Sequence, residues 1–141
     1  MDLKEVGKLN LMTALIYGEA RGENIVGKIG VGCVVKNRAI DTRWPRGIED
    51  VILQPGQFSC FNSGDKNFEL VCDTACKASK YLDKLDFRES RWVAFGVLNG
   101  WIRDVTGGAN HYHELNMEKY PYWSDNKKVT KIIGDHIFYK L

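Results

Sequence analysis

Glu19 is the residue whose place in the sequence is hardest to explain by packing alone. At about 100° per residue, a helix over Lys8–Ala20 puts its side chain in the middle of the apolar face. Glutamate is rarely buried without a partner, and burial raises its pKa by disfavouring the ionised form. A carboxyl that keeps its proton near neutral pH can act as a general acid. The alternative is a buried salt bridge to Arg21, Arg38 or Arg103.

The three histidines raise the question of a metal site. His111 and His113 alternate along a short predicted strand, so their side chains share one face, and His136 could supply a third ligand. Such a set could hold the zinc ion of an amidase. Because the sequence has neither an HExxH motif nor a CxxC pair, we expect no metal and no cofactor.

Composition indicates a single soluble domain over residues 1–141, 44% hydrophobic and 27% charged. The net charge of +2 is too small to predict nucleic-acid binding, and the cluster of Lys127, Lys128 and Lys131 is expected to be a solvated face. Apolar runs fall far short of the ~18 residues that a membrane span needs. We therefore expect a monomer that binds neither nucleic acid nor membrane, with its four cysteines as free thiols.

Hydrophobic periodicity predicts helices first and strands last, which indicates an α+β domain. The predicted helices are Lys8–Ala20, Val26–Ile40, Ile48–Leu53, Phe68–Leu85 and one that ends at Asn99, with Asp86 as its N-cap and Glu89 as the capping-box partner. The predicted strands are Asn110–His113 and a hairpin of Val129–Ile133 and His136–Tyr139. The helix over Val26–Ile40 is apolar nearly all round, so it should be central, and its Gly27, Gly30 and Gly32 should let a neighbouring backbone approach.

Several motifs follow one another along most of the chain. They are Leu15–Glu23 with Gly27 and Lys36–Arg38, Trp44–Pro45 with Asp50–Ile52, Gln54–Ser59, Thr106–His113 with Trp123, and Ile133–Phe138. In this order they resemble the SleB-type cell-wall hydrolases, which are the catalytic domains of spore-cortex-lytic enzymes and of related phage endolysins. Only the stretch from about Phe61 to Trp92 has no motif that we can place.

The resemblance implies a fold similar to that of lysozyme and the lytic transglycosylases, mostly helical with a small C-terminal β element. It implies that the partner is the glycan strand of peptidoglycan and that Glu19 is the single essential carboxylate. Protonated Glu19 would donate to the oxygen that links N-acetylmuramic acid to N-acetylglucosamine. The carboxylate would then take the proton of the sugar's own C6 hydroxyl, which closes a 1,6-anhydro ring without a second carboxylate.

Other residues in the matching motifs are candidates for sugar binding. They are Gln57, Phe58, Ser59, Asn110, His111, Tyr112 and Trp123. The amide of Gln57 offers a donor and an acceptor, and Phe58 offers an apolar face unless it belongs to the core. The stretch from Asn110 to Tyr112 is expected to line the cleft opposite Glu19, with polar groups that orient either the sugar or Glu19. Trp123 and Tyr122 either stack on sugars or form a rim of the core.

Glu23 is the candidate for a second catalytic carboxylate. On an unbroken helix it would follow Glu19 by one turn, with about 5–6 Å between the Cβ atoms, close to the spacing in retaining glycosidases. Because Gly22 makes an unbroken helix doubtful, we expect Glu23 to open or cap the second helix instead.

Two other functions compete with a transglycosylase: a hydrolytic muramidase, in which water replaces the C6 hydroxyl, and a peptidoglycan-binding module without activity. The first residues, Met1–Val6, mix charges and do not resemble a signal peptide. The expectation is therefore a chain made in the cytoplasm that reaches the wall through a phage-made membrane hole, as an endolysin does.

Overall fold

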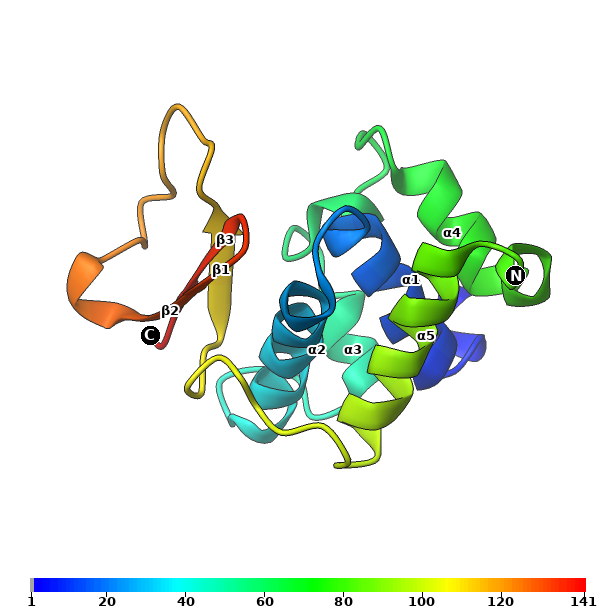
Figure 1. Ribbon diagram of the computed structural model, residues 1–141, viewed down its shortest axis with the longest axis horizontal. Helices are drawn as coiled ribbons and strands as arrows, with labels where there is room; N and C mark the ends of the chain where they lie inside the picture. The colour runs from blue at the N-terminus through cyan, green and yellow to red at the C-terminus, as the bar shows by residue number, and fades with distance from the viewer. Residues whose placement is uncertain (1) are drawn as a thin grey trace.

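The computed structural model describes residues 2–141, which form a layer of helices with a small sheet against one side (Figure 1). The helices are α1 (Lys8–Ala20), α2 (Ile25–Ile40), α3 (Ile48–Ile52), α4 (Phe68–Cys76) and α5 (Leu85–Leu98), with short 3₁₀ turns at Leu3–Glu5, Ser59–Phe61, Ala78–Tyr81 and Asn126–Lys128. The strands β1 (His111–Glu114), β2 (Val129–Ile133) and β3 (His136–Tyr139) form an antiparallel sheet in the order β1-β3-β2. The predicted α+β class is confirmed.

Helix α1 lies at the centre of the helical layer and contacts each of the other four helices. Its residues 11–17 are all buried, so it has no solvated face over this length. A Cβ at Gly18 would lie 2.6 Å from Val71 of α4, so a larger residue would force these two helices apart. The predicted bounds of this helix are confirmed, and Glu19 lies in its last turn.

Helix α2 lies between the other helices and the sheet (Figure 1). A Cβ at Gly30 would lie 2.6 Å from the ring of Phe138 in β3, which is fully buried between the two layers. The close approach that the glycines predicted is therefore present, but a side chain makes it rather than a backbone. This contact fixes the sheet against α2.

The predicted helix Phe68–Leu85 is wrong, because α4 ends at Cys76. Lys77 leaves the helical conformation with φ −128° and ψ 47°, and a 3₁₀ turn follows. The hydroxyl of Tyr81 in this turn donates to Asp73, and its ring lies 5.7 Å from that of Phe87. These contacts across the turn replace the helical hydrogen bonds that a continuous helix would make.

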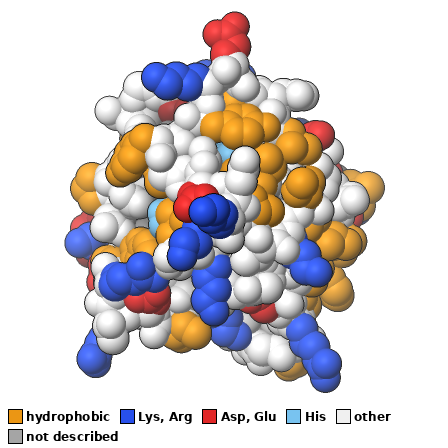
Figure 2. Space-filling view, turned by 90° about the vertical axis from the view of Figure 1, so that its left-hand side faces the viewer, with side chains coloured by type: hydrophobic (Ala, Val, Ile, Leu, Met, Phe, Trp, Pro, Cys, Tyr) orange, Lys and Arg blue, Asp and Glu red, His pale blue; other side chains and the backbone are white. Residues whose placement is uncertain are grey.

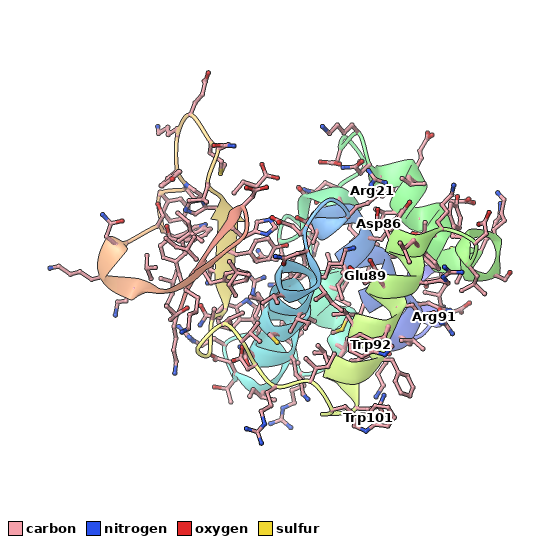
Figure 3. The ribbon with its side chains drawn as sticks, in the orientation of Figure 1. Arg21, Asp86, Glu89, Arg91, Trp92 and Trp101 are labelled. Atoms are coloured by element: carbon pink, nitrogen blue, oxygen red, sulfur yellow. The ribbon has the colours of Figure 1, made fainter. Side chains whose placement is uncertain are left out.

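The predicted capping box of Asp86 and Glu89 is also wrong. Helix α5 begins two residues earlier, after Lys84, whose side chain makes no capping bond. Asp86 and Glu89 instead turn toward α2, where each accepts a hydrogen bond of 3.0 Å from Nζ of Lys28 (Figure 3). The side chain of Lys28 is only 1% exposed, so two carboxylates on α5 hold a buried cation of α2.

No helix within residues 2–141 is long and apolar enough to cross a membrane. All four cysteines are free thiols, and Cys33 and Cys60 are buried. Lys127, Lys128 and Lys131 are exposed. On the sheet side, hydrophobic side chains gather over the upper part and Lys and Arg mainly below (Figure 2).

Candidate active site

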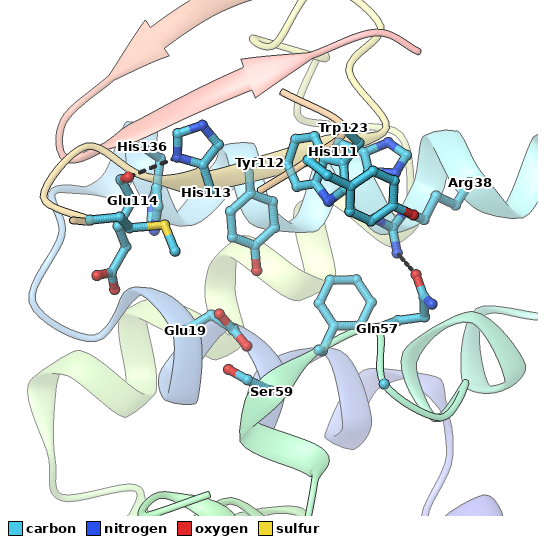
Figure 4. Close-up of a pocket in the computed structure, with 14 residues that line it drawn as sticks. Glu19, Arg38, Gln57, Ser59, His111, Tyr112, His113, Glu114, Trp123 and His136 are labelled. Atoms are coloured by element: carbon cyan, nitrogen blue, oxygen red, sulfur yellow. Dashed lines mark hydrogen bonds between the residues drawn. The ribbon is translucent and has the colours of Figure 1, made fainter. Parts of the chain in front are cut away.

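A cavity of about 570 Å³ opens between the helical layer and the sheet. One wall is formed by Glu19 and the loop that carries Gln57, Phe58 and Ser59 (Figure 4). The facing wall comes from β1 and the segment after it, with His111, Tyr112 and Trp123. The structure thus brings together, from four separate stretches of the chain, most of the residues that the sequence pointed to.

The carboxyl of Glu19 borders this cavity, and one of its two oxygens has no partner. Its Oε1 is buried and has no hydrogen-bond partner within residues 2–141, and none of the ion pairs in this part of the chain includes it. The salt-bridge alternative is therefore wrong: Arg21 lies over the ring of Tyr17 at 4.9 Å, and Arg38 binds elsewhere. Burial raises the pKa of Glu19, and the opposing effects of Cys60, Tyr112 and His136, which lower it, are weaker. Glu19 has the properties of a proton donor.

Tyr112 faces Glu19 from the sheet (Figure 4). Its Oη is buried and has no hydrogen-bond partner among the described residues. Its ring is held between those of Phe58, His136 and Phe138, with centroid distances of 6.5, 5.1 and 5.8 Å. Burial, followed by the charge of Glu19, raises the pKa of Tyr112 well above its usual value, so its hydroxyl keeps its proton.

Glu23 does not cap α2 as expected, because Asn24 does so by accepting a hydrogen bond from the backbone N–H of Gly27. Glu23 instead reaches the β2–β3 turn, where its Oε1 accepts a 3.0 Å bond from the N–H of Asp135 and lies 3.4 Å from Nδ1 of His136. It lines a second cavity, of about 260 Å³, which Glu19 also borders. Its carboxylate is thus near Glu19 but already engaged by the sheet.

Arg38 is a site residue that the sequence suggested only as a salt-bridge partner. It is 4% exposed, and its Nε donates a 2.7 Å hydrogen bond to the carbonyl of Asn110. One terminal nitrogen donates to Oε1 of Gln57 at 3.4 Å, and the guanidinium lies 5.1 Å from the ring of Phe58. Burial lowers its pKa. Arg38 is one of three charged residues, with Lys28 and Lys36, in a helix that is otherwise mostly apolar, and this was the signal that could have identified it.

The histidines do not form a metal site. Nδ1 of His113 donates to the carbonyl of Glu114 at 2.8 Å, and Nε2 accepts from the hydroxyl of Tyr139 at 2.7 Å, so both ring nitrogens are occupied. Burial, and then the charges of Arg38 and Arg43, lower the pKa of His111 to about 4. Within residues 2–141, no three His, Cys, Asp or Glu side chains are arranged to hold a metal ion.

Asn110 is the one predicted sugar-binding residue that the structure does not bring to the cavity. Its Nδ2 donates to the carbonyl of Leu141, and its Oδ1 accepts from the N–H of Leu141, both at 3.0 Å. The same Oδ1 accepts a 2.8 Å bond from Nδ1 of His111. Asn110 therefore fastens the end of the chain to β1 and orients His111, which does line the cavity.

Trp123 lies across the two histidines of β1, with its ring 4.8 Å from that of His111 and 5.7 Å from that of His113. Tyr122, beside it, is fully exposed at the mouth of the cavity. The cavity also includes Glu114 and Met117, which had no sequence signal because nothing in the pattern places the segment after β1.

Comparisons with known proteins agree with this architecture. The family described as cell wall hydrolase matches residues 22–139. A spore cortex-lytic enzyme of Bacillus cereus is 30% identical over 132 residues, which are 94% of this chain and 44% of that protein. That of Halalkalibacterium halodurans is 30% identical over 130 residues, which are 92% of this chain and 34% of that protein. The chain thus spans less than half the length of these relatives.

Two solved structures have a similar fold. The catalytic domain of the Bacillus cereus SleB protein matches with a TM-score of 0.68 and 26% identity, over 94% of this chain and 89% of that one. The catalytic domain of the germination-specific lytic transglycosylase SleB from Bacillus anthracis matches with a TM-score of 0.68 and 25% identity, over 94% and 93%. On the family match over most of its length, this chain belongs to the cell wall hydrolase family.

Proposed function

We propose that this chain cleaves the bond between N-acetylmuramic acid and N-acetylglucosamine in peptidoglycan, as a lytic transglycosylase. The observation that carries the proposal is the carboxyl of Glu19, whose Oε1 is buried and unpaired beside a cavity large enough for sugar residues. The names of the similar proteins, a spore cortex-lytic enzyme and a lytic transglycosylase, support the same substrate class and reaction.

The reaction has two proton transfers at Glu19. The protonated carboxyl donates to the glycosidic oxygen while the bond to the muramic acid breaks through an oxocarbenium-like state. The carboxylate then accepts the proton of the C6 hydroxyl of the same sugar, whose oxygen bonds to C1. Gln57, Ser59, His111 and Trp123 are proposed to bind the flanking sugars by hydrogen bonds and stacking.

The state of Glu23 argues against the hydrolytic route in which Glu23 itself would be the second carboxylate. A hydrolase that retains configuration needs a second free carboxylate close to the first. Glu23 is the carboxylate that the sequence suggested for this role, but it accepts a bond from Asp135 and lies beside His136. An intramolecular C6 hydroxyl needs no such group, because the sugar itself holds it in place.

Replacement of Glu19 tests the proposal. We expect Glu19→Gln to lower the rate of turbidity loss of purified sacculi and of spore cortex by about 10²- to 10⁴-fold, the usual contribution of a general acid or base. Glu69→Gln, which removes an exposed carboxyl on α4, should keep the wild-type rate. A wild-type rate for Glu19→Gln would remove Glu19 from the mechanism.

Mass spectrometry of the digest identifies the reaction. Anhydro-muramic ends are expected, whereas reducing ends would show a hydrolytic muramidase. A wild-type protein that binds every wall preparation but cleaves none would be a binding module. The endolysin role and the route to the wall stay predictions from the sequence.

A further inference from the structure

We propose that Tyr112 is a positioning residue for Glu19, whose hydroxyl accepts a hydrogen bond from the carboxylic acid and donates one to the carboxylate. This inference rests on the proposed function, because it concerns a carboxyl that serves first as acid and then as base. Of the two roles that the sequence left open for the stretch from Asn110 to Tyr112, orienting the sugar or orienting Glu19, it assigns the second to the hydroxyl of Tyr112 and states how that hydroxyl acts in each half of the reaction.

The geometry that supports this role is a pair of unsatisfied oxygens in one cavity. Oε1 of Glu19 and Oη of Tyr112 are both buried, and neither has a hydrogen-bond partner among the described residues. They come from opposite walls, α1 and β1, and the hydroxyl points toward the carboxyl (Figure 4). Buried polar groups without partners are rare, and catalytic hydrogen bonds are often long in an empty site and shorten when substrate binds.

The chemistry of a phenol suits both halves of the reaction. A hydroxyl has one donor and two acceptor positions, so rotation about its C–O bond lets it bond either form of a carboxyl. Because burial keeps the phenol protonated, the donor is present whenever Glu19 loses its proton. The rings of Phe58, His136 and Phe138 hold the tyrosine ring, so the hydroxyl stays in place through both steps.

No other group around Glu19 offers the same combination. Several titratable groups face Glu19 across the two cavities or pack against it: the thiol of Cys60, the carboxyls of Glu23, Glu114 and Asp135, the imidazoles of His111, His113 and His136, and the hydroxyls of Tyr112 and Tyr122. Carboxylates cannot donate to Glu19, and the thiol is a weak donor. Nδ1 of His136 lies 3.4 Å from Oε1 of Glu23, Nδ1 of His111 bonds Asn110, and both ring nitrogens of His113 are occupied. Tyr122 is fully exposed. Arg38 also borders the cavity, but it is engaged by Asn110 and Gln57.

The variant Tyr112→Phe tests the proposal, because it removes the hydroxyl and keeps the ring. The carboxyl carbons of the free protein, labelled with ¹³C in glutamate, are titrated by NMR, with Glu19→Gln used to assign the Glu19 signal. Loss of a donor to the carboxylate should raise the pKa of Glu19 further. In the assay, kcat should fall by about 10-fold or more, as for loss of a hydrogen bond to a charged group, while KM stays nearly constant. The alkaline limb of the pH profile should move to higher pH.

Tyr139→Phe is the matched control. It also removes a buried tyrosine hydroxyl from the sheet, but one that bonds His113 rather than facing Glu19. It should leave the titration of Glu19 unchanged. An unchanged Glu19 titration in folded Tyr112→Phe would overturn the proposal. Because the titration needs no substrate, it still tests Tyr112 even if the wild-type protein cleaves no glycan.

Discussion

At the scale of single residues, an ionised carboxyl in a buried position without a partner destabilises the fold. Substitution of Glu19 should therefore affect the free energy of unfolding differently from substitution of the apolar core residues around it. Because its pKa is raised in the folded state, the folded protein holds this proton more tightly than the unfolded chain does. The contribution of this bound proton to the stability of the fold is present at low pH and is lost as the pH rises through the folded-state pKa of Glu19.

Glu19→Gln should therefore stabilise the protein while it abolishes activity. We expect the free energy of unfolding to rise by about 1–3 kcal/mol at pH 8, the range for a buried unsatisfied group, and by much less at pH 5. Urea unfolding at the two pH values measures the difference, with Glu69→Gln as the control. A variant less stable than wild type at pH 8 would contradict the burial argument.

The sequence predicted those features of single residues that depend on the local helix or strand alone. Helical periodicity placed Glu19 on the core side of α1, where the structure has it. The partner of Asn110 lies 31 residues away, at Leu141, and Glu23 meets Asp135 112 residues away. Such contacts depend on how the sheet docks on the helices, which no local pattern encodes.

At the scale of elements, the ion cluster of Lys28, Asp86 and Glu89 joins α2 to α5 and is asymmetric. The side chain of Lys28 is 1% exposed, whereas those of Asp86 and Glu89 are 55% and 33% exposed. Burial lowers the pKa of Lys28, but the hydrogen bonds and charges of Glu89 and Asp86 outweigh this effect and raise it. The buried ammonium of Lys28 therefore needs the two carboxylates to compensate its charge, whereas the carboxylates remain partly hydrated without it.

Removal of either side of this cluster should accordingly have unequal effects. The double variant Asp86→Asn, Glu89→Gln leaves a buried cation without countercharge and should cost about 3–5 kcal/mol of stability. Lys28→Met leaves two carboxylates that water still reaches and should cost less. Chemical denaturation of the two variants provides the comparison, and an equal loss would contradict the asymmetry.

The same cluster explains why the middle of the chain was the part least well predicted. The spacing of Asp86 and Glu89 is that of a capping box, but the same spacing places both side chains on one helix face, where they meet Lys28. No glycine or proline marks the break after Cys76, because the contact of Tyr81 with Asp73 makes it. The elements with strong periodicity, α1 and the β2–β3 hairpin, were predicted at their observed bounds.

At the scale of the whole molecule, the sequence predicts a monomer, and residues of this chain line the cavity beside Glu19. We expect a mass near 16.1 kDa by light scattering coupled to size-exclusion chromatography. Trp92 and Trp101, 60% and 75% exposed, lie on the far side of α5 from the sheet (Figure 3). A dimer mass that Trp101→Ser reduces to that of a monomer would contradict the expectation and locate the interface there.

The enclosure of α1 by its neighbours also limits how the chain can change in length. One residue inserted into or deleted from this helix would rotate Glu19 by about 100° and move it about 1.5 Å along the axis, away from the cavity. A shift of register in α1 is therefore excluded even where a substitution of similar size would fit. Insertions and deletions are expected in connections such as residues 62–67, because there they do not move the carboxyl of Glu19 away from the cavity.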